Sequence, residues 1–288
     1  MRFVQFLEGA HKGLAVEIEG ALRGLSENEA GYPGSLHDLL KAGQPALQAA
    51  HRTLGAARVI DRDAIRYLPP IERPGKIVCV GLNYADHTKE SPYEQPTYPT
   101  FFPRFATTLI GHGEAIVRPN ASEQLDYEGE LAVIIGSRGR HIPRERALEH
   151  VAGYSIFNEA SVRDYQFKSP QWTIGKNFDA TGAFGPTFVS ADELPPGAKG
   201  LGLITRLNGK IEQQANTADL VFDVVELIAV LSEAVTLEPG DVIVTGTPAG
   251  IGWARRPMLF MQPGDLCTVE IEGLGTLSNP IAAETPPA

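Results

Sequence analysis

The chain has 288 residues, which is long enough for one or two domains with a sizeable buried core. Its 25 basic and 35 acidic residues give a formal net charge of −10, which disfavours nucleic acids and anionic membranes as partners, because both require clustered Lys and Arg. The 30 glycines and 22 prolines exceed the content of a typical domain and favour strands and turns over a helical bundle.

The start of the sequence and its cysteines indicate a compartment. Residues 1–8 lack the basic start and apolar core of a signal peptide, and the sequence has no run of about 18 apolar residues. Cys79 and Cys267 each stand alone in an apolar segment, which excludes a disulfide framework and a Cys-x-x-Cys metal knuckle. We therefore expect a cytoplasmic protein that does not span a membrane.

The first part of the chain predicts a few strands and one helix. Short alternating apolar runs at residues 1–7 and 14–18 are typical of strands. A helix is predicted to begin at Ser35, with Asp38 in its first turn, and to continue through Leu47. These residues show no pattern that indicates chemistry.

A domain boundary is predicted near residue 70. Residues 68–75 contain three prolines and one glycine, which neither a helix nor a central strand accommodates. We therefore predict a small N-terminal α+β domain of residues 1–70 and a larger domain of residues 71–288.

The sequence predicts that the larger domain is α+β and rich in β-sheet. One helix is predicted at residues 224–231, where apolar residues recur every three or four positions and Asp223 with Glu226 forms a capping-box start. A second, short helix is predicted after Pro143. Apolar runs of strand length, each closed by turn residues, occur at residues 76–80, 131–135, 203–207, 242–245 and 266–271.

Glu128 and Glu130 begin the apolar run that ends at residue 135. On a strand, residues i and i+2 share a face, so both carboxylates project together. Two oxygen donors without a nearby His or Cys favour Mg²⁺ or Mn²⁺ over zinc. The alternative is a pair of solvated glutamates at a strand end.

Two later segments add polar side chains near apolar runs. Glu159 follows a strand-like run and offers a third carboxylate, while Arg163 offers an anion contact. Lys176 stands alone among apolar, aromatic and glycine residues. Taken singly, these residues also fit a solvated loop and a surface lysine.

An acid–base pair is predicted after the strand at residues 76–80. If a helical turn follows, His87 and Glu90 face each other as i and i+3, so that the carboxylate raises the basicity of the imidazole. A solvated loop histidine is the alternative. Residues 244–252 form a small-residue loop suited to a carboxylate, which lacks the lysine of a P-loop.

Taken together and in order, these segments resemble the fumarylacetoacetate hydrolase family, in particular its acylpyruvase-like members. The resemblance covers residues 74–281. It is carried by GLNYADHTKE from residue 81, DYEGELAVIIG from 126, NEASVRDYQ from 158, TIGKNF from 173, FDVVELIAVLS from 222 and VTGTPAGIG from 244.

The resemblance implies a homodimer of mixed β-roll subunits that hold one Mg²⁺ or Mn²⁺ on Glu128, Glu130 and Glu159. The family usually has Asp where this chain has Glu159, and Ala where it has Val162, so the geometry of the site is expected to differ. His87, Glu90 and Lys176 match the catalytic residues, with His87 and Glu90 as the water-activating pair on a mobile lid. The residues implied to bind substrate are Arg104, Arg163, Gln166 and Thr247, the last through the substrate carboxylate.

The implied activity is metal-dependent hydrolysis of the carbon–carbon bond in an acylpyruvate-like 2,4-dioxo acid, which yields pyruvate or another 2-oxo acid and a carboxylic acid. The metal stabilises the enolate that leaves when the bond breaks. Two alternatives use the same enolate: oxaloacetate decarboxylation, and isomerisation or hydration of unsaturated 2-oxo dioic acids. A relative that binds a metal or metabolite without catalysis is a further alternative.

Overall fold

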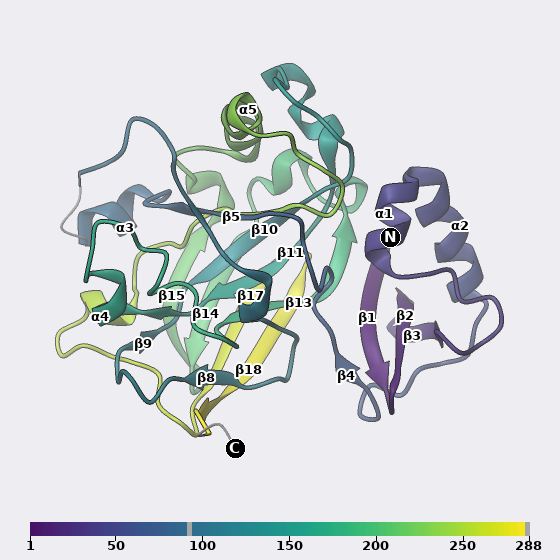
Figure 1. The fold of residues 1–288 in the computed structure, drawn as a ribbon, viewed down its shortest axis with the longest axis horizontal. Helices are drawn as coiled ribbons and strands as arrows, with labels where there is room; N and C mark the ends of the chain where they lie inside the picture. Colours follow the sequence, from purple (N-terminus) through teal and green to yellow (C-terminus); the bar gives the residue numbers. More distant parts are fainter. Residues whose placement is uncertain (91–93, 286–288) are drawn as a thin grey trace.

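A mixed sheet of eleven strands runs through the centre of the molecule in the computed structural model, which describes residues 1–90 and 94–285 (Figure 1). Its strands follow the order β3 (Ala21–Ser26), β2 (His11–Ile18), β1 (Arg2–Glu8), β13 (Gly182–Ser190), β11 (Val151–Glu159), β10 (Gly129–Ile135), β16 (Val242–Val244), β5 (Ile77–Gly81) and β6 (Thr100–Pro103), with β4 (Arg66–Tyr67) beside β1 and β7 (Leu109–Ile110) beside β13.

A second sheet packs against the first. It has five strands in the order β15 (Lys210–Asn216), β14 (Gly202–Leu207), β17 (Leu266–Ile271), β18 (Gly275–Ala283) and β8 (Ile116–Arg118), and a short pair is formed by β9 (Leu125–Asp126) and β12 (Ser161–Val162). The space between the sheets is filled by apolar side chains of β10, β11, β14, β17 and β18. This arrangement is the predicted α+β class with a mixed β architecture.

Strand β10 is buried on both faces. Its alternate residues Leu131 and Val133 lie in the core between the two sheets, whereas Ala132 and Ile134 lie in a second core on the opposite face. A strand that is apolar at every position can be accommodated only in this way. The rigid placement of β10 fixes the residues that stand at its start.

The helices cover the outer faces of the sheets. Figure 1 shows α1 and α2 beside β1–β3 at the right of the view, and α5 at the top of the view, above β5 and β10. The α-helices are α1 (Leu36–Ala42), α2 (Gln44–Gly55), α3 (Ala85–Glu90), α4 (Arg163–Gln166) and α5 (Val224–Ala234). The 3₁₀ helices are η1 (Ala106–Thr108), η2 (Arg144–His150), η3 (Ala191–Glu193), η4 (Pro196–Ala198), η5 (Thr217–Asp219) and η6 (Gly252–Ala254).

The helix starts predicted at Ser35 and Asp223 are confirmed. Ser35 accepts a hydrogen bond from the backbone N–H of Asp38, and Asp223 accepts one from that of Glu226. The prediction of one continuous helix through Leu47 is wrong, because Gly43 adopts a positive φ of 88° and divides it into α1 and α2. The helix predicted after Pro143 is a 3₁₀ helix.

The N-terminal strands β1–β4 belong to the large sheet, together with strands from the rest of the chain. Arg2 and Phe3 of β1 pair with Val189 and Phe188 of β13. The division of the chain near residue 70 stays a prediction. Within the described residues, none of the helices combines the length and the apolar character that crossing a membrane requires.

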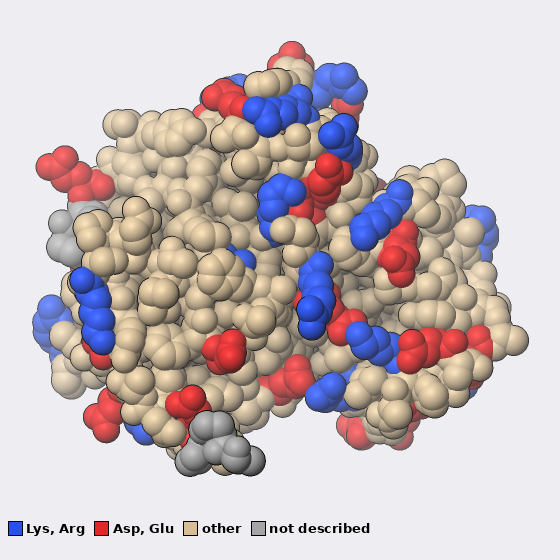
Figure 2. Space-filling view, viewed as in Figure 1, with Lys and Arg blue, Asp and Glu red and all other residues tan. Residues whose placement is uncertain are grey.

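Acidic and basic side chains are interspersed on the face shown in Figure 2. Many of the surface charges form ion pairs, such as Lys12 with Glu72 at 2.8 Å and Arg138 with Glu238 at 2.9 Å. Exposed pairs contribute only about 0–1 kcal/mol each. The stability of the fold therefore depends on its apolar cores.

Candidate active site

Three buried carboxylates meet where β10 begins and β11 ends. Because these strands are antiparallel neighbours, the start of one lies beside the end of the other, and the N–H of Glu159 donates to the carbonyl of Glu128 at 2.9 Å. Glu130 lies two residues further along on the same face. One carboxylate oxygen of each residue lies within 4.8 Å of those of the other two.

The cluster fits a divalent cation. The three side chains are at most 4% exposed, and Glu159 Oε1 is buried and has no hydrogen-bond partner in the part of the chain that the structure describes. Burial, together with the charges of Glu159 and Glu128, raises the pKa of Glu130 well above its usual value. A hard cation bound by these oxygens would offset both the burial of Glu130 and its repulsion by the other two carboxylates. Asp126 lies outside the cluster and pairs with Arg163 at 2.8 Å.

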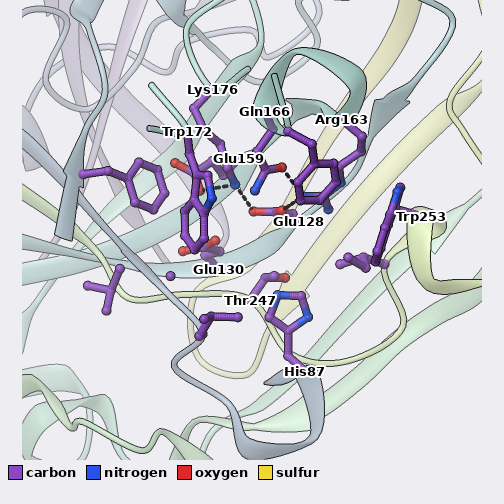
Figure 3. Close-up of a pocket in the computed structure, with 16 residues that line it drawn as sticks. His87, Glu128, Glu130, Glu159, Arg163, Gln166, Trp172, Lys176, Thr247 and Trp253 are labelled. Carbon is purple, nitrogen blue, oxygen red and sulfur yellow. Dashed lines mark hydrogen bonds and ion pairs between the residues drawn. The ribbon is translucent and has the colours of Figure 1, made fainter. Parts of the chain in front are cut away.

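Two buried cations hold the cluster together. Lys176 Nζ donates to Glu128 at 2.7 Å and to Glu159 at 2.9 Å, and the Arg163 guanidinium lies 2.6 Å from the other oxygen of Glu128 (Figure 3). Burial alone would raise the pKa of Glu128, but these two positive charges outweigh it and hold the pKa below its usual value. Burial acts to lower the pKa of Lys176, but Glu128 and Glu159 raise it, so the lysine stays charged.

Arg104 is not among the residues that line the cavity in front of the cluster. It is buried and lies 3.5 Å from Glu159 Oε1, and its guanidinium donates to Thr108 and Thr181. This placement supports a role in positioning Glu159. It does not support the predicted contact between Arg104 and the substrate.

His87 and Glu90 lie on α3, across the cavity from the carboxylates. The predicted helical turn is confirmed, with His87 Nδ1 and Glu90 Oε1 3.0 Å apart. Glu90 also accepts the backbone N–H of Gly250 at 3.0 Å, which ties α3 to the loop that follows β16. In Figure 3 the His87 ring points toward the carboxylate cluster. When Nδ1–H donates to Glu90, Nε2 is the nitrogen that can accept a proton.

The remaining predicted residues also line the cavity. Gln166 accepts a hydrogen bond from Arg163 at 2.8 Å. Thr247 donates its hydroxyl hydrogen to the carbonyl of Gly129 and accepts from Gln213 Nε2 at 2.8 Å, so the hydroxyl is already held by the protein. Its predicted contact with the substrate carboxylate, like the roles of the other site residues, stays a prediction.

Sequence reasoning missed the apolar part of the lining. It is built from residues of five separate segments: Val80, Gly81, Leu82, Phe102, Phe167, Trp172, Ile251 and Trp253. Nothing in the local patterns distinguishes these residues from ordinary core positions. Their meeting depends on the order of strands in the sheet.

The assignment of Glu159 as the third carboxylate ligand leads to a specific prediction. Glu159→Asp keeps a charged oxygen donor and is expected to retain divalent-cation binding, whereas Glu159→Gln removes the charge and is expected to weaken it about tenfold or more. Calorimetric titration of the metal-free protein with Mn²⁺ measures the difference. Equal affinity of Glu159→Gln and the wild type would place the third ligand elsewhere.

Fold and site together define a class of mixed β-sheet proteins with a buried carboxylate triad beside a lysine. The family model described as "Fumarylacetoacetate (FAA) hydrolase C-terminal" matches residues 76–282. The chain therefore belongs to the fumarylacetoacetate hydrolase family, which confirms the resemblance.

Similar proteins agree with this assignment. The oxaloacetate tautomerase Fahd2a, mitochondrial, of Rattus norvegicus is 39% identical over 98% of this chain and 91% of its own length. The structure of the fumarylacetoacetate hydrolase of Exiguobacterium antarcticum has a TM-score of 0.86 at 36% identity, covering 99% of this chain and 100% of that chain.

A further structure is that of maleylpyruvate hydrolase from Sphingobium sp. SYK-6 in complex with manganese(II) and pyruvate. It has a TM-score of 0.81 at 26% identity and covers 99% of this chain and 100% of that chain. The rat protein's name places that protein in mitochondria. The cytoplasmic location expected for the present chain stays a prediction.

Proposed function

We propose that this protein is a divalent-cation-dependent tautomerase that interconverts the enol and keto forms of a 2-oxo acid, with oxaloacetate as substrate. The observation that carries the proposal is the placement of the His87–Glu90 pair across the cavity from the carboxylate cluster. One side of the cavity thus offers a proton acceptor, and the other offers a site for a cation. The 39% identity to a named oxaloacetate tautomerase supports it.

The chain's own residues supply the steps of this reaction. In the direction from keto to enol, the C3–H bond of the substrate breaks and its proton moves to His87 Nε2. The electron pair of that bond forms the C2=C3 double bond, and the π pair of the C2=O bond moves onto the C2 oxygen. This oxygen takes a proton from water, and the imidazolium returns its own proton to the solvent. Glu90 holds the imidazole in the required tautomer and stabilises its protonated form. The reverse direction returns the proton from Nε2 to C3.

A cation held by Glu128, Glu130 and Glu159 would act as a Lewis acid that stabilises negative charge on the C2 oxygen. Lys176 and Arg163 keep two of these carboxylates in place, and Arg163 Nη2 is a buried N–H group without a partner in the described residues. We infer that this group binds the substrate carboxylate. The preference between Mg²⁺ and Mn²⁺ and the homodimer remain proposals.

Tautomerisation replaces hydrolysis as the first choice. The named relatives support the alternatives, isomerisation and oxaloacetate chemistry, better than acylpyruvate hydrolysis. Hydrolysis also requires His87 to position an attacking water, whereas tautomerisation requires only that it accept and return a proton.

The test is the loss of enol absorbance when oxaloacetate is added to the protein with Mg²⁺ or Mn²⁺. We expect this loss to be faster than with the metal alone, and to return to the background rate after chelation by EDTA. Coupling to a pyruvate assay separates decarboxylation, and acylpyruvates test hydrolysis. Tautomerisation no faster than the metal-only control would overturn the proposal.

A further inference from the structure

Two aromatic pairs border the carboxylate cluster. Phe102 and Trp172 pack edge to face with ring centroids 5.6 Å apart, and Phe167 and Trp253 lie 5.0 Å apart at an angle of 45°. All four residues line the cavity. In Figure 3, Trp172 lies beside Lys176, whereas Trp253 lies on the other side of Glu128, nearer His87.

The first pair packs into the protein. A Cβ atom on Gly81 would lie 2.2 Å from the Trp172 ring, so the absence of a side chain at Gly81 makes room for this indole. Phe102 is buried, and Lys176 Nζ lies 5.2 Å from its ring centroid. The Phe102–Trp172 pair therefore shields the lysine and the carboxylates from water.

The second pair is different, because the Phe167 ring is exposed while the backbone of both residues is anchored. Phe167 is 39% exposed, although it follows directly on α4, which carries Arg163 and Gln166. The N–H of Phe167 donates to the carbonyl of Arg163 at 3.1 Å, and the N–H of Trp253 donates to Asp126 at 2.9 Å. Phe167 and Trp253 thus form a preformed aromatic wall at the cavity.

The buried charges around the cluster are sufficient to bind a substrate that has one carboxylate. The buried charge network formed by the cluster, Asp126 and three cations has four carboxylates, so a divalent cation would give the network one net positive charge, which one substrate carboxylate neutralises. Its carboxylates are Asp126, Glu128, Glu130 and Glu159, and its cations are Arg104, Arg163 and Lys176. Two of these cations, Lys176 and Arg163, line the cavity. Each of them is already paired with two carboxylates of the protein.

We propose that the site also accepts monoanionic 2-oxo acids with an aromatic group on C3, the arylpyruvates, and tautomerises them. This rests on the proposed function, because it uses the same cation and the same proton transfer. The substrate ring lies against Phe167 and Trp253, where offset or edge-to-face contacts between rings are favourable. His87 lies on the same side, so the C3–H proton moves to Nε2 as the C2=C3 double bond forms. The π pair of the C2=O bond moves onto the C2 oxygen, which takes a proton from water while Nε2 returns its proton to the solvent.

The kinetic test uses phenylpyruvate and oxaloacetate with Phe167→Leu and Trp253→Leu. We expect turnover of both substrates by the wild type. Each substitution is expected to raise KM for phenylpyruvate by about tenfold and to change that for oxaloacetate less than about twofold. Tyr98→Leu removes an aromatic ring that is 59% exposed and outside the lining, and it is the matched control.

A second measurement reports binding without turnover. The chain has two tryptophans, and both line the cavity, so Trp172→Phe leaves Trp253 as the only fluorophore of its kind. Phenylpyruvate with Mg²⁺ is expected to quench this fluorescence, and pyruvate, which lacks the ring, is expected to quench it much less. The signal is corrected with free tryptophan.

The outcomes separate this inference from the proposed function. Turnover of oxaloacetate without turnover of phenylpyruvate, or equal losses on both substrates in the wall variants, overturns the inference and leaves the proposed function standing. Failure on both substrates overturns the proposed function and, with it, arylpyruvate turnover. Equal quenching by pyruvate and phenylpyruvate overturns the contact between the substrate ring and the aromatic wall.

Discussion

Replacing His87 with alanine is expected to lower kcat for oxaloacetate tautomerisation by about 10²- to 10⁴-fold, the usual contribution of a general base. The imidazole is held 3.0 Å from Glu90 and faces the carboxylate cluster without belonging to it. Divalent-cation affinity is therefore expected to stay near that of the wild type. Initial rates of enol loss and a calorimetric Mn²⁺ titration on the same preparation measure the two quantities.

A matched control lies on the same helix. The side chain of Asp86 is 80% exposed and, among the described residues, pairs with the exposed Lys89, so Asp86→Ala tests for nonspecific damage to α3. Oxaloacetate decarboxylation needs no attacking water and is expected to fall much less than tautomerisation in His87→Ala. A loss of Mn²⁺ affinity equal to the loss of kcat would show that His87 acts on the metal site instead of on the proton.

Replacing Lys176 with methionine is expected to destabilise the metal-free protein by about 3–5 kcal/mol, the cost of removing one partner from a buried ion pair. Lys176 is 4% exposed and is bonded to both Glu128 and Glu159, so the variant leaves three buried carboxylates with less compensation. Urea unfolding at neutral pH measures the loss.

The metal adds a second expectation for the same variant. Saturating Mg²⁺ stabilises any protein that binds it only when folded, and the gain is expected to be larger in Lys176→Met than in the wild type, because the cation replaces the missing positive charge. Lys199→Met, at an exposed lysine, is the control. Unchanged stability of metal-free Lys176→Met would mean that the carboxylates take up protons in place of the lysine charge.

The sequence was sufficient to predict the parts of the site that depend on local geometry. The period of two along β10 places Glu128 and Glu130 together, and the i, i+3 spacing on α3 places His87 beside Glu90, as found. Contacts between segments that lie far apart in the sequence could not be predicted from such local patterns. Glu90 is also bound by Gly250, which lies 160 residues further along the chain.

Arg104 shows why such contacts escape prediction. The resemblance implies that Arg104 binds substrate, and this stays a prediction. Its contact with Glu159 could not be predicted, because it arises from the pairing of β6 with β5 in the sheet, after which Arg104 follows β6 directly. The aromatic wall could not be predicted for the same reason, because the Phe167 and Trp253 rings come within 5.0 Å of each other only when the chain folds. Such positions depend on the topology of the sheet, which the periodicity of apolar residues along the sequence does not reveal.

The pairing of β13 also determines whether its edge can pair with strands of neighbouring molecules. The side of β13 away from β11 is closed by two separate segments: β7 pairs with Gly182 and Ala183, and β1 pairs with Phe188 and Val189. A chain shortened to residues 76–282, the span of the family match, would keep β7 and lose β1. The uncovered half of β13 would then offer free N–H and C=O groups to strands of neighbouring molecules. The N-terminal segment thus protects the catalytic sheet from aggregation, although the candidate active site contains none of its residues.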